Sequence, residues 1–434
     1  MIDLDEFMDT DHNKNTFAFV LGRESELALL EVKAVLGRFG FGFCISSVSD
    51  NIAIIKFEEA GSLQMTADSL ISSLGGTTKI FELYKKASPD LKKEIIDMVI
   101  AEKSENGSKI DFGISNFSKR TLNINKLGIE VKTALKPQIK SRFVAIKEGQ
   151  ELSTIVSQTN KLDGKGVEVG VFDEYLGRLI AISNPFEWSK RDYGKPAGDK
   201  YSGMLPPKLA RMMVNLSIGE SNDKSIVVDP FCGSGNIPIE ALMLGHDIIA
   251  SDISEKAVMD TKLNIEWVIA RNEMTKQSIK KIAAPSGLAM TGKTFSIFQA
   301  DATKHDFLAP LSTLDLELST RDVIIVAEPY LGEPKKFKPS KNAVLGEFKK
   351  LEGIYLGFLK NLASLLRASS CQLSAVCLVF PLVESSDGGQ ISLFAASVDE
   401  IEKMGYTLLR PPLVYGRDYQ VVKREILFLQ APKS

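Results

Sequence analysis

Hydrophobic and polar positions follow one pattern before about residue 220 and another after it. In the second half, short runs of valine, isoleucine and leucine recur between segments with helical periodicity. Continuous apolar runs are typical of parallel strands that are buried on both faces. The pattern therefore predicts a doubly wound α/β sheet of about seven mostly parallel strands. The predicted strands are SIVVD, DIIASD, FSIFQAD, DVIIVAEP, LSAVCLVFP and REILFLQA.

The first half predicts two smaller α/β units. Over 1–76, strands alternate with amphipathic helices, and this order favours a ferredoxin-like unit. A second unit is predicted over 77–172, and a segment over 173–219 links it to the domain at 220–434. Part of that linking segment is rich in Gly, Pro and charge, as expected of a linker or a substrate-side loop. The predicted strands are 15–22, 51–57, 109–117, 141–146 and 167–172, and the predicted helices are 24–40, 62–76, 92–104, 127–139 and 207–219.

Composition limits the class of protein. The chain has 434 residues, 44% of them hydrophobic, which predicts two or three domains. It has four cysteines without a CxxC pair and three histidines, so we expect neither a disulfide framework nor a metal site. The first residues are acidic, and no apolar run approaches membrane-spanning length. We therefore expect a cytosolic protein.

One basic cluster stands out in a chain whose net charge is −2. Residues 119–147 hold eight lysines and arginines and a single acid, Glu130. A charge run is most often a solvated helix face. A one-sided cluster is also what a phosphate backbone requires, so we weigh RNA or DNA contact slightly above the solvated face. The candidate contacts are Lys132, Lys136, Lys140 and Arg142.

The glycine loop after SIVVD is the clearest chemical signal. Residues 227–241 read VVDPFCGSGNIPIEA, with a helix expected from Ile237. The loop lacks the ending of a phosphate-binding Walker loop, and Pro238 occupies the third glycine position of GxGxxG. Gly233 and Gly235 still allow a ligand to approach the backbone, and Asp229 suits a cationic group.

Two further acids follow the next strands of the predicted sheet. Asp252 could accept hydrogen bonds from both hydroxyls of a ribose, and Asp301 could accept one from the exocyclic amine of adenine. Either acid could instead cap a helix. A ligand with a ribose, an adenine and a positive charge, but no polyphosphate, is S-adenosylmethionine.

The fourth strand ends in EPYLG, which faces the same edge of the sheet. Glu328 and the carbonyl of Pro329 could accept the two N–H bonds of an exocyclic base amine as it gains charge. Tyr330 could stack on the base after the base leaves its helical stack. The alternative is a structural turn at the end of the strand with Tyr330 in the core.

These motifs resemble those of the THUMP-domain RNA methyltransferases. DPFCGSGNIPIEA is similar to the family's first motif, DPFCGSGT or DPFCGTGG followed by a helix with IEA. KIDFGISNF and the segments after it resemble the THUMP module. RDYGKPAGDKYSGMLPPKLARMMVNL resembles the linker of the archaeal and eukaryotic tRNA guanine-N2 methyltransferases. The resemblance covers about 15–428.

The resemblance implies a ferredoxin-like unit, a THUMP module and a class I, Rossmann-like methyltransferase domain. THUMP would grip the acceptor end of tRNA or another structured RNA. Eukaryotic members use a small activating partner and archaeal members act alone, and the sequence does not distinguish these. The implied contacts with S-adenosylmethionine are Asp229, Phe231, Gly233 and Gly235 on its methionine and ribose side, Asp252 on the ribose and Asp301 on the adenine.

The catalytic motif departs from the family's [DN]PPY. Glu328 replaces a shorter residue, and Tyr330 replaces the second proline. We expect methyl transfer to guanine N2 of tRNA. The alternatives are an rRNA or a DNA amino-methyltransferase, and an RNA-binding protein with a degenerate methyltransferase domain.

Overall fold

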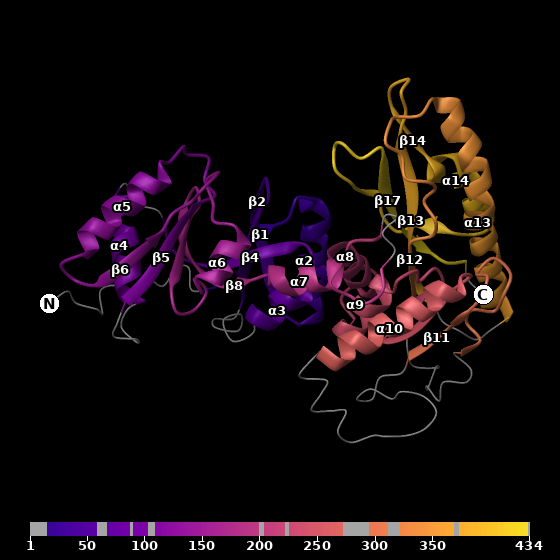
Figure 1. The fold of residues 1–434 in the computed structure, drawn as a ribbon, viewed down its shortest axis with the longest axis horizontal. Helices are drawn as coiled ribbons and strands as arrows, with labels where there is room; N and C mark the ends of the chain where they lie inside the picture. Colours follow the sequence, from indigo (N-terminus) through magenta and orange to yellow (C-terminus); the bar gives the residue numbers. More distant parts are fainter. Residues whose placement is uncertain are drawn as a thin grey trace, which may run out of the picture. The chain divides into compact units, whose positions relative to one another are not determined.

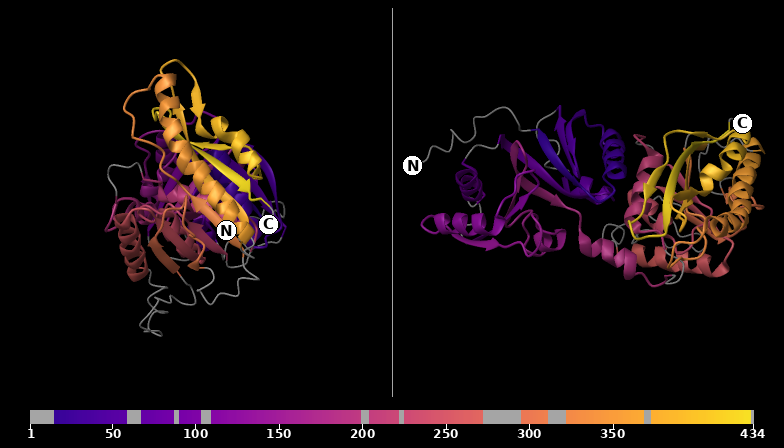
Figure 2. Two further views of the ribbon diagram at one scale, coloured as in Figure 1. Left: turned by 90° about the vertical axis from the view of Figure 1, so that its right-hand side faces the viewer. Right: turned by 90° about the horizontal axis from the view of Figure 1, so that it is seen from above.

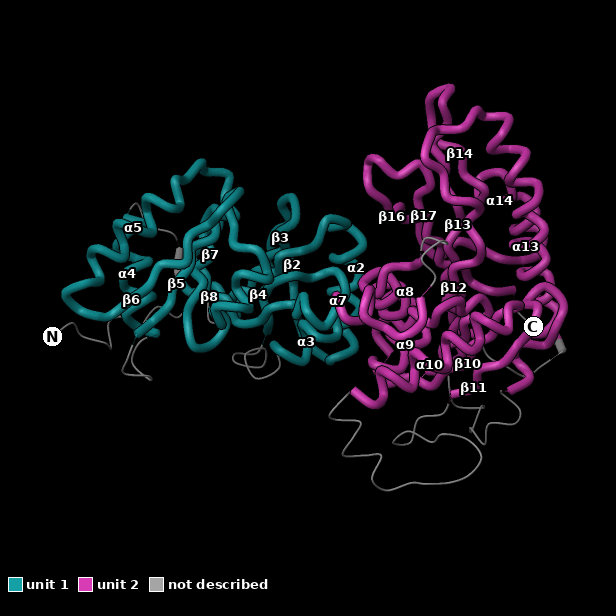
Figure 3. Tube along the Cα trace, in the orientation of Figure 1, with its two compact units in different colours: residues 1–188 teal, residues 189–434 magenta. Residues whose placement is uncertain are grey.

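The computed structural model describes nine stretches of the chain: 15–58, 67–86, 90–102, 109–198, 204–221, 225–271, 295–310, 322–368 and 373–432. It divides into two compact units, residues 1–188 and 189–434 (Figure 3). Residues 62–66 of one predicted helix, 199–203 of the linker and Cys371 lie outside the described part. Within it, no helix has the length and apolar composition needed to cross a membrane.

The first unit begins with a βαββαβ order. Strands β1 and β3 pair antiparallel at its centre, and the strand order is β2-β3-β1-β4. This is the arrangement of a ferredoxin-like unit. The edge strand β2 was not predicted because all seven of its residues are exposed or half-buried. The elements are β1 (Thr16–Leu21), α2 (Ser25–Arg38), β2 (Phe43–Ser49), β3 (Ile52–Phe57), α3 (Ala67–Ser73) and β4 (Thr77–Lys86).

The same sheet continues into the following residues. Strand β4 pairs with β1 on one side and with β8 on the other, and the order then runs β8-β7-β5-β6. The predicted boundary at 76/77 therefore falls at the start of a shared strand, and the four-part division of the chain stays a prediction. The added elements are α4 (Leu91–Ala101), β5 (Lys109–Asn116), α5 (Ile124–Leu135), β6 (Lys140–Val144), α6 (Thr154–Thr159), β7 (Val167–Val171) and β8 (Tyr175–Ile182).

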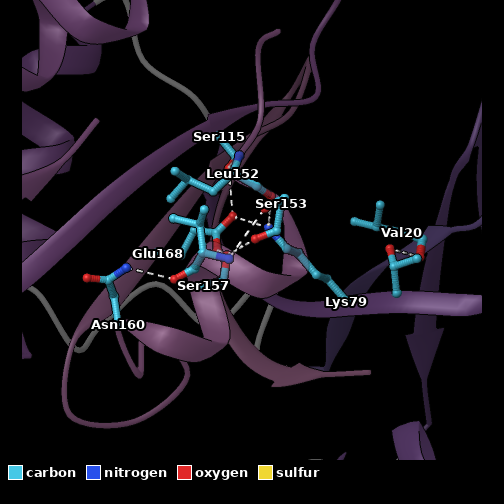
Figure 4. A network of polar contacts seen from close by, with 10 residues as sticks. Val20, Lys79, Ser115, Leu152, Ser153, Ser157, Asn160 and Glu168 are labelled. Atoms are coloured by element: carbon cyan, nitrogen blue, oxygen red, sulfur yellow. Dashed lines mark hydrogen bonds and ion pairs between the residues drawn. The ribbon is translucent and has the colours of Figure 1, made fainter. Parts of the chain in front are cut away.

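A buried polar network joins the two halves of this sheet (Figure 4). Lys79 on β4 donates to a Glu168 oxygen on β7 and to the Leu152 carbonyl, both at 2.6 Å. Glu168 also accepts from Ser115 at 2.6 Å and from Ser157 at 2.5 Å. The Lys79 and Glu168 side chains are only 2% and 0% exposed, so each charge depends on the other for compensation.

The second unit is a doubly wound sheet. Five parallel strands run in the order β11-β10-β9-β12-β13, and β17 pairs antiparallel with β13. Helix α7 (Pro185–Tyr193) spans the division between the two units. The elements after it are α8 (Pro207–Ile218), β9 (Ile226–Asp229), α9 (Asn236–Leu244), β10 (Asp247–Asp252), α10 (Glu255–Arg271), β11 (Phe295–Gln299), β12 (Val323–Ala327), α13 (Lys341–Ala368), β13 (Leu373–Glu384), β14 (Gln390–Ser392), α14 (Leu393–Lys403), β15 (Thr407–Leu408), β16 (Leu413–Tyr415) and β17 (Val422–Gln430).

This sheet differs from the expected one of about seven mostly parallel strands. It is mixed and has nine strands in the described residues, because β14, β15 and β16 add short antiparallel pairings. These three strands have only three, two and three residues, too few to produce a recognisable periodicity.

Helices cover both faces of the sheet (Figure 1). The long helix α13 turns the same side inward at each turn, and Phe348, Tyr355 and Phe358 are at most 4% exposed in the core. Both views of Figure 2 show α13, in orange, beside the yellow strands β13 and β17. Strand order reverses between β9 and β12, where the loops diverge and open a crevice at the carboxyl ends of the strands.

Candidate active site

The glycine loop follows β9 at this crevice. Gly233 and Gly235 have φ of 51° and 84°, a left-handed region that disfavours other residues. A Cβ on Gly233 would meet no atom within 4 Å, so the loop has open space in front of it, whereas one on Gly235 would approach Thr261 Cγ2 to 3.0 Å. Helix α9 begins at Asn236, one residue before its expected start, and Pro238 fits because it lies in the first turn.

Asp252 ties the glycine loop to the end of β10. One of its oxygens accepts the Gly233 N–H at 3.0 Å, and the other accepts the Ser254 N–H at 2.9 Å. The side chain that caps the following helix belongs to Ser254, which accepts from the Ala257 N–H at 3.4 Å. Asp252 is thus bound by the loop rather than used as the helix cap, and it lies on the wall of the pocket.

Asp229 is the most buried acid of the site, at 2% exposure. It accepts the Phe231 N–H at 3.1 Å. Burial first, and then the nearby charges of Asp252 and Glu328, raise the pKa of Asp229 well above its ordinary value. A cationic ligand between these three carboxylates would relieve their mutual repulsion.

Glu328 follows β12 and is held by an arginine that the sequence did not indicate. Arg424 on β17 contacts a single oxygen of Glu328, Oε1, through Nε at 3.0 Å and Nη2 at 2.9 Å. The other oxygen, Oε2, is buried and has no hydrogen-bond partner among the residues that the structure describes. Burial raises the pKa of Glu328, and Arg424 opposes that rise.

These residues line one pocket of about 350 Å³. Its wall includes seven of the predicted residues: Asp229, Phe231, Gly233, Asp252, Glu328, Pro329 and Tyr330. Gly235 and Asp301 are not on the wall. The Asp301 carboxylate accepts from the N–H and hydroxyl of Thr303, at 3.0 and 2.6 Å, and pairs with Lys304. Its assignment to adenine stays a prediction.

The aromatic residues of the site differ in their freedom. Phe231 packs edge-on against Phe358, with ring centroids 5.3 Å apart. Tyr330 is 50% exposed, contrary to the alternative that places it in the core. Its backbone carbonyl accepts from the Tyr355 hydroxyl at 3.2 Å, so α13 holds the loop while the Tyr330 ring faces solvent and the pocket.

The segment before α8 also supports the glycine loop. The sequence did not indicate this contact. Lys195 donates to Ser234 Oγ at 2.8 Å and to Asn236 Oδ1 at 2.6 Å. Asn264 on α10 exchanges hydrogen bonds with Ala197 and donates to the Ser234 carbonyl. Burial lowers the pKa of Lys195 to about 8, against the opposing effect of nearby carboxylates. Only the motif similarity of this segment could have indicated such a role.

The predicted RNA contacts lie in the first unit, on α5, β6 and the turn between them. Lys136, Lys140 and Arg142 are exposed, and Lys132 is half-buried. Arg142 is not free, because it pairs with Asp111 at 2.5 Å and donates to Asn160 at 2.6 Å. No contact in the structure tests their role in RNA binding, which stays a prediction.

Comparison with known proteins gives matches to methyltransferases. Residues 197–335 match a family model described as RMKL-like, methyltransferase domain, and residues 59–263 match one described as DNA methylase. The tRNA (guanine(10)-N2)-dimethyltransferase of Methanocaldococcus jannaschii is 41% identical over 96 residues, 21% of this chain and 27% of that protein. The protein of that name in Methanothermobacter thermautotrophicus is 39% identical over 89 residues, 20% of this chain and 25% of that protein.

The matches thus span about a quarter of the length of these curated relatives. Among solved structures, SMU.472, a candidate methyltransferase in complex with SAH, is 13% identical, with a TM-score of 0.47, and the match covers 97% of this chain and 99% of that one. The two relatives confirm the predicted resemblance to the tRNA guanine-N2 methyltransferases.

Proposed function

We propose that this chain, a relative of the tRNA guanine-N2 methyltransferases, transfers a methyl group from S-adenosylmethionine to an exocyclic amine of RNA, with guanine N2 of tRNA as the first candidate. The observation that carries the proposal is the position of three carboxylates. Asp229 and Asp252 are the last residues of β9 and β10, Glu328 follows β12, and all three line one pocket at the switch point of a doubly wound sheet.

The donor site is supported by its shape and charge. The open backbone at Gly233 admits a ligand, and Asp252 remains available to ribose hydroxyls because each carboxylate oxygen can accept more than one hydrogen bond. The carboxylates favour a cation without a polyphosphate. When bound, S-adenosylmethionine supplies a methyl group activated by a sulfonium.

The acceptor site is supported by the unpartnered oxygen of Glu328. As the exocyclic nitrogen forms its bond to the methyl carbon, the bond from that carbon to the donor's sulfur breaks, and the nitrogen gains positive charge and must lose a proton. Glu328 Oε2 can accept a hydrogen bond from one N–H and then that proton, and the Pro329 carbonyl can accept from the other. The exposed ring of Tyr330 can stack on the base.

The first unit would bind the RNA. We infer a THUMP module over 77–172, with Lys132, Lys136, Lys140 and Arg142 on phosphates. A tRNA substrate accords with a cytosolic location. That location, and action without an obligatory protein partner, stay predictions.

The test is methyl transfer from labelled S-adenosylmethionine to unmodified tRNA transcripts, followed by nucleoside analysis. Parallel reactions contain rRNA or duplex DNA, and Glu328→Ala is the inactive control. Label recovered as N2-methylguanosine, and lost in the variant, supports the proposal. Label on DNA would favour a DNA amino-methyltransferase. Donor binding without label on any nucleic acid would leave an RNA-binding protein with a degenerate site.

A further inference from the structure

The pair formed by Glu328 and Arg424 joins the catalytic loop after β12 to the last strand of the sheet. In the chain these residues are 96 positions apart, and no motif connects them. Their side chains are only 12% and 9% exposed. Two nitrogens of Arg424 contact Oε1, at 2.9 and 3.0 Å, and Oε2 is buried without a hydrogen-bond partner in the described part of the chain.

We propose that Arg424 is a positioning residue for methyl transfer. It anchors the longer side chain of Glu328 by one oxygen, so that the other oxygen alone faces the acceptor amine. The inference rests on the proposed function and deepens it.

Geometry explains why a glutamate at this position needs such an anchor. A glutamate has one more rotatable bond than the aspartate or asparagine of the family's motif, and a catalytic group must be held close to its productive orientation. Two N–H groups of one guanidinium on the same oxygen fix that orientation. Glu328 lines the pocket, and its Oε2 is buried with no hydrogen-bond partner among the described residues, so no other donor there competes for it.

Charge supplies the second reason. Among the described residues, the groups that face Glu328 from neighbouring elements are Asp229 at the end of β9, Tyr355 on α13 and Arg424 on β17. Of these only Arg424 is a cation. Burial raises the pKa of Glu328, and among the described residues Arg424 is the group that opposes that rise. A protonated Glu328 could not accept the proton of the acceptor amine.

The experiment compares the pH dependence of methyl transfer in the wild type, Arg424→Met and Arg424→Lys. For Arg424→Met we expect kcat at pH 7 to fall about ten- to hundredfold, the acid limb of its profile to move to higher pH, and KM for S-adenosylmethionine to stay within about twofold. Arg424→Lys keeps the positive charge but loses the planar guanidinium with its two N–H donors to Oε1. The acid limb of its pH profile should therefore remain near that of the wild type, at a reduced kcat. Lys423→Met is the matched control, because it removes a cation from the same strand while Glu384 keeps its contact with Lys338.

A second measurement separates failure of this inference from failure of the proposed function. Titration of Glu328 by carbon NMR of protein labelled at the glutamate carboxyl, with the signal assigned by Glu328→Gln, requires no turnover. A higher pKa in Arg424→Met supports the inference. An unmoved pKa, or an Arg424→Met enzyme with the wild-type kcat and profile, would overturn it. If the wild type transfers no methyl group, the proposed function fails, and the titration still decides whether Arg424 sets the charge of Glu328.

Discussion

Replacing Asp252 by alanine should remove most of the affinity for the donor. In the structure each oxygen of Asp252 accepts one backbone N–H, from Gly233 and Ser254. The ribose hydroxyls would add two further hydrogen bonds to the same carboxylate. A hydrogen bond to a charged group contributes about 1.5–3 kcal/mol, so the loss of two amounts to about 3–6 kcal/mol. This corresponds to an increase of about 10²- to 10⁴-fold in Kd.

Isothermal titration with S-adenosylhomocysteine is the suitable assay, because this ligand lacks the sulfonium and leaves the charge contribution out. Asp252→Asn should weaken binding less than alanine does, since its amide oxygen can still accept one N–H. Asp306→Asn is the control, because the Asp306 side chain accepts the Leu308 N–H at 3.0 Å and an asparagine side chain can do the same. A folded Asp252→Ala protein whose Kd lies within about threefold of the wild-type value would refute the ribose assignment.

Three further predictions follow from the same geometry. Asp229→Asn keeps the acceptor for the Phe231 N–H but removes a buried carboxyl group with a raised pKa. Ionisation of that group lowers the stability of the wild type as pH rises from its pKa in the unfolded state to its pKa in the folded state. Thermal unfolding above that interval should therefore show the variant to be more stable by about 0.5–2 kcal/mol, with weaker donor binding. The double variant Lys132→Glu with Arg142→Glu should bind tRNA more weakly and with a smaller dependence on salt, as measured by filter binding from low to high salt. An unchanged dependence of affinity on salt would mean that the basic cluster is a solvated helix face and not an RNA contact. Lys79→Met leaves Glu168 buried without compensation and should cost about 3–5 kcal/mol in denaturant unfolding, with much of it recovered by adding Glu168→Gln.

Several features of the fold followed directly from the residue pattern. The runs of valine and isoleucine identified β9, β10, β12 and β13, because a strand that is buried on both faces needs apolar side chains at every position. The helix from Ser25 to Arg38 followed from its apolar spacing. Strands β2 and β14–β16 did not follow, because an exposed edge or a strand of two or three residues leaves no period to detect.

The candidate site was predictable where local chemistry was sufficient. Asp229, Gly233 and Asp252 could be identified because an acid at the end of a strand and a glycine in a turn are local signals, and parallel strands bring their carboxyl ends to one edge. The sequence also indicated Glu328. It did not indicate that Asp301 would bind its own turn through Thr303, because competition between a neighbouring hydroxyl and a ligand depends on the local backbone.

The partners of those residues came only from the tertiary structure. Arg424 reaches Glu328 because β17 returns to the sheet antiparallel beside β13, and Lys195 reaches Asn236 because the segment before α8 folds back over the glycine loop. In the first unit, Lys79 and Glu168 meet because β4, β8 and β7 are successive strands of one sheet. Strand order and side-chain direction decide such pairs. Sequence determines which groups can carry charge or allow a turn, but a buried charge finds its partner through contacts between distant segments.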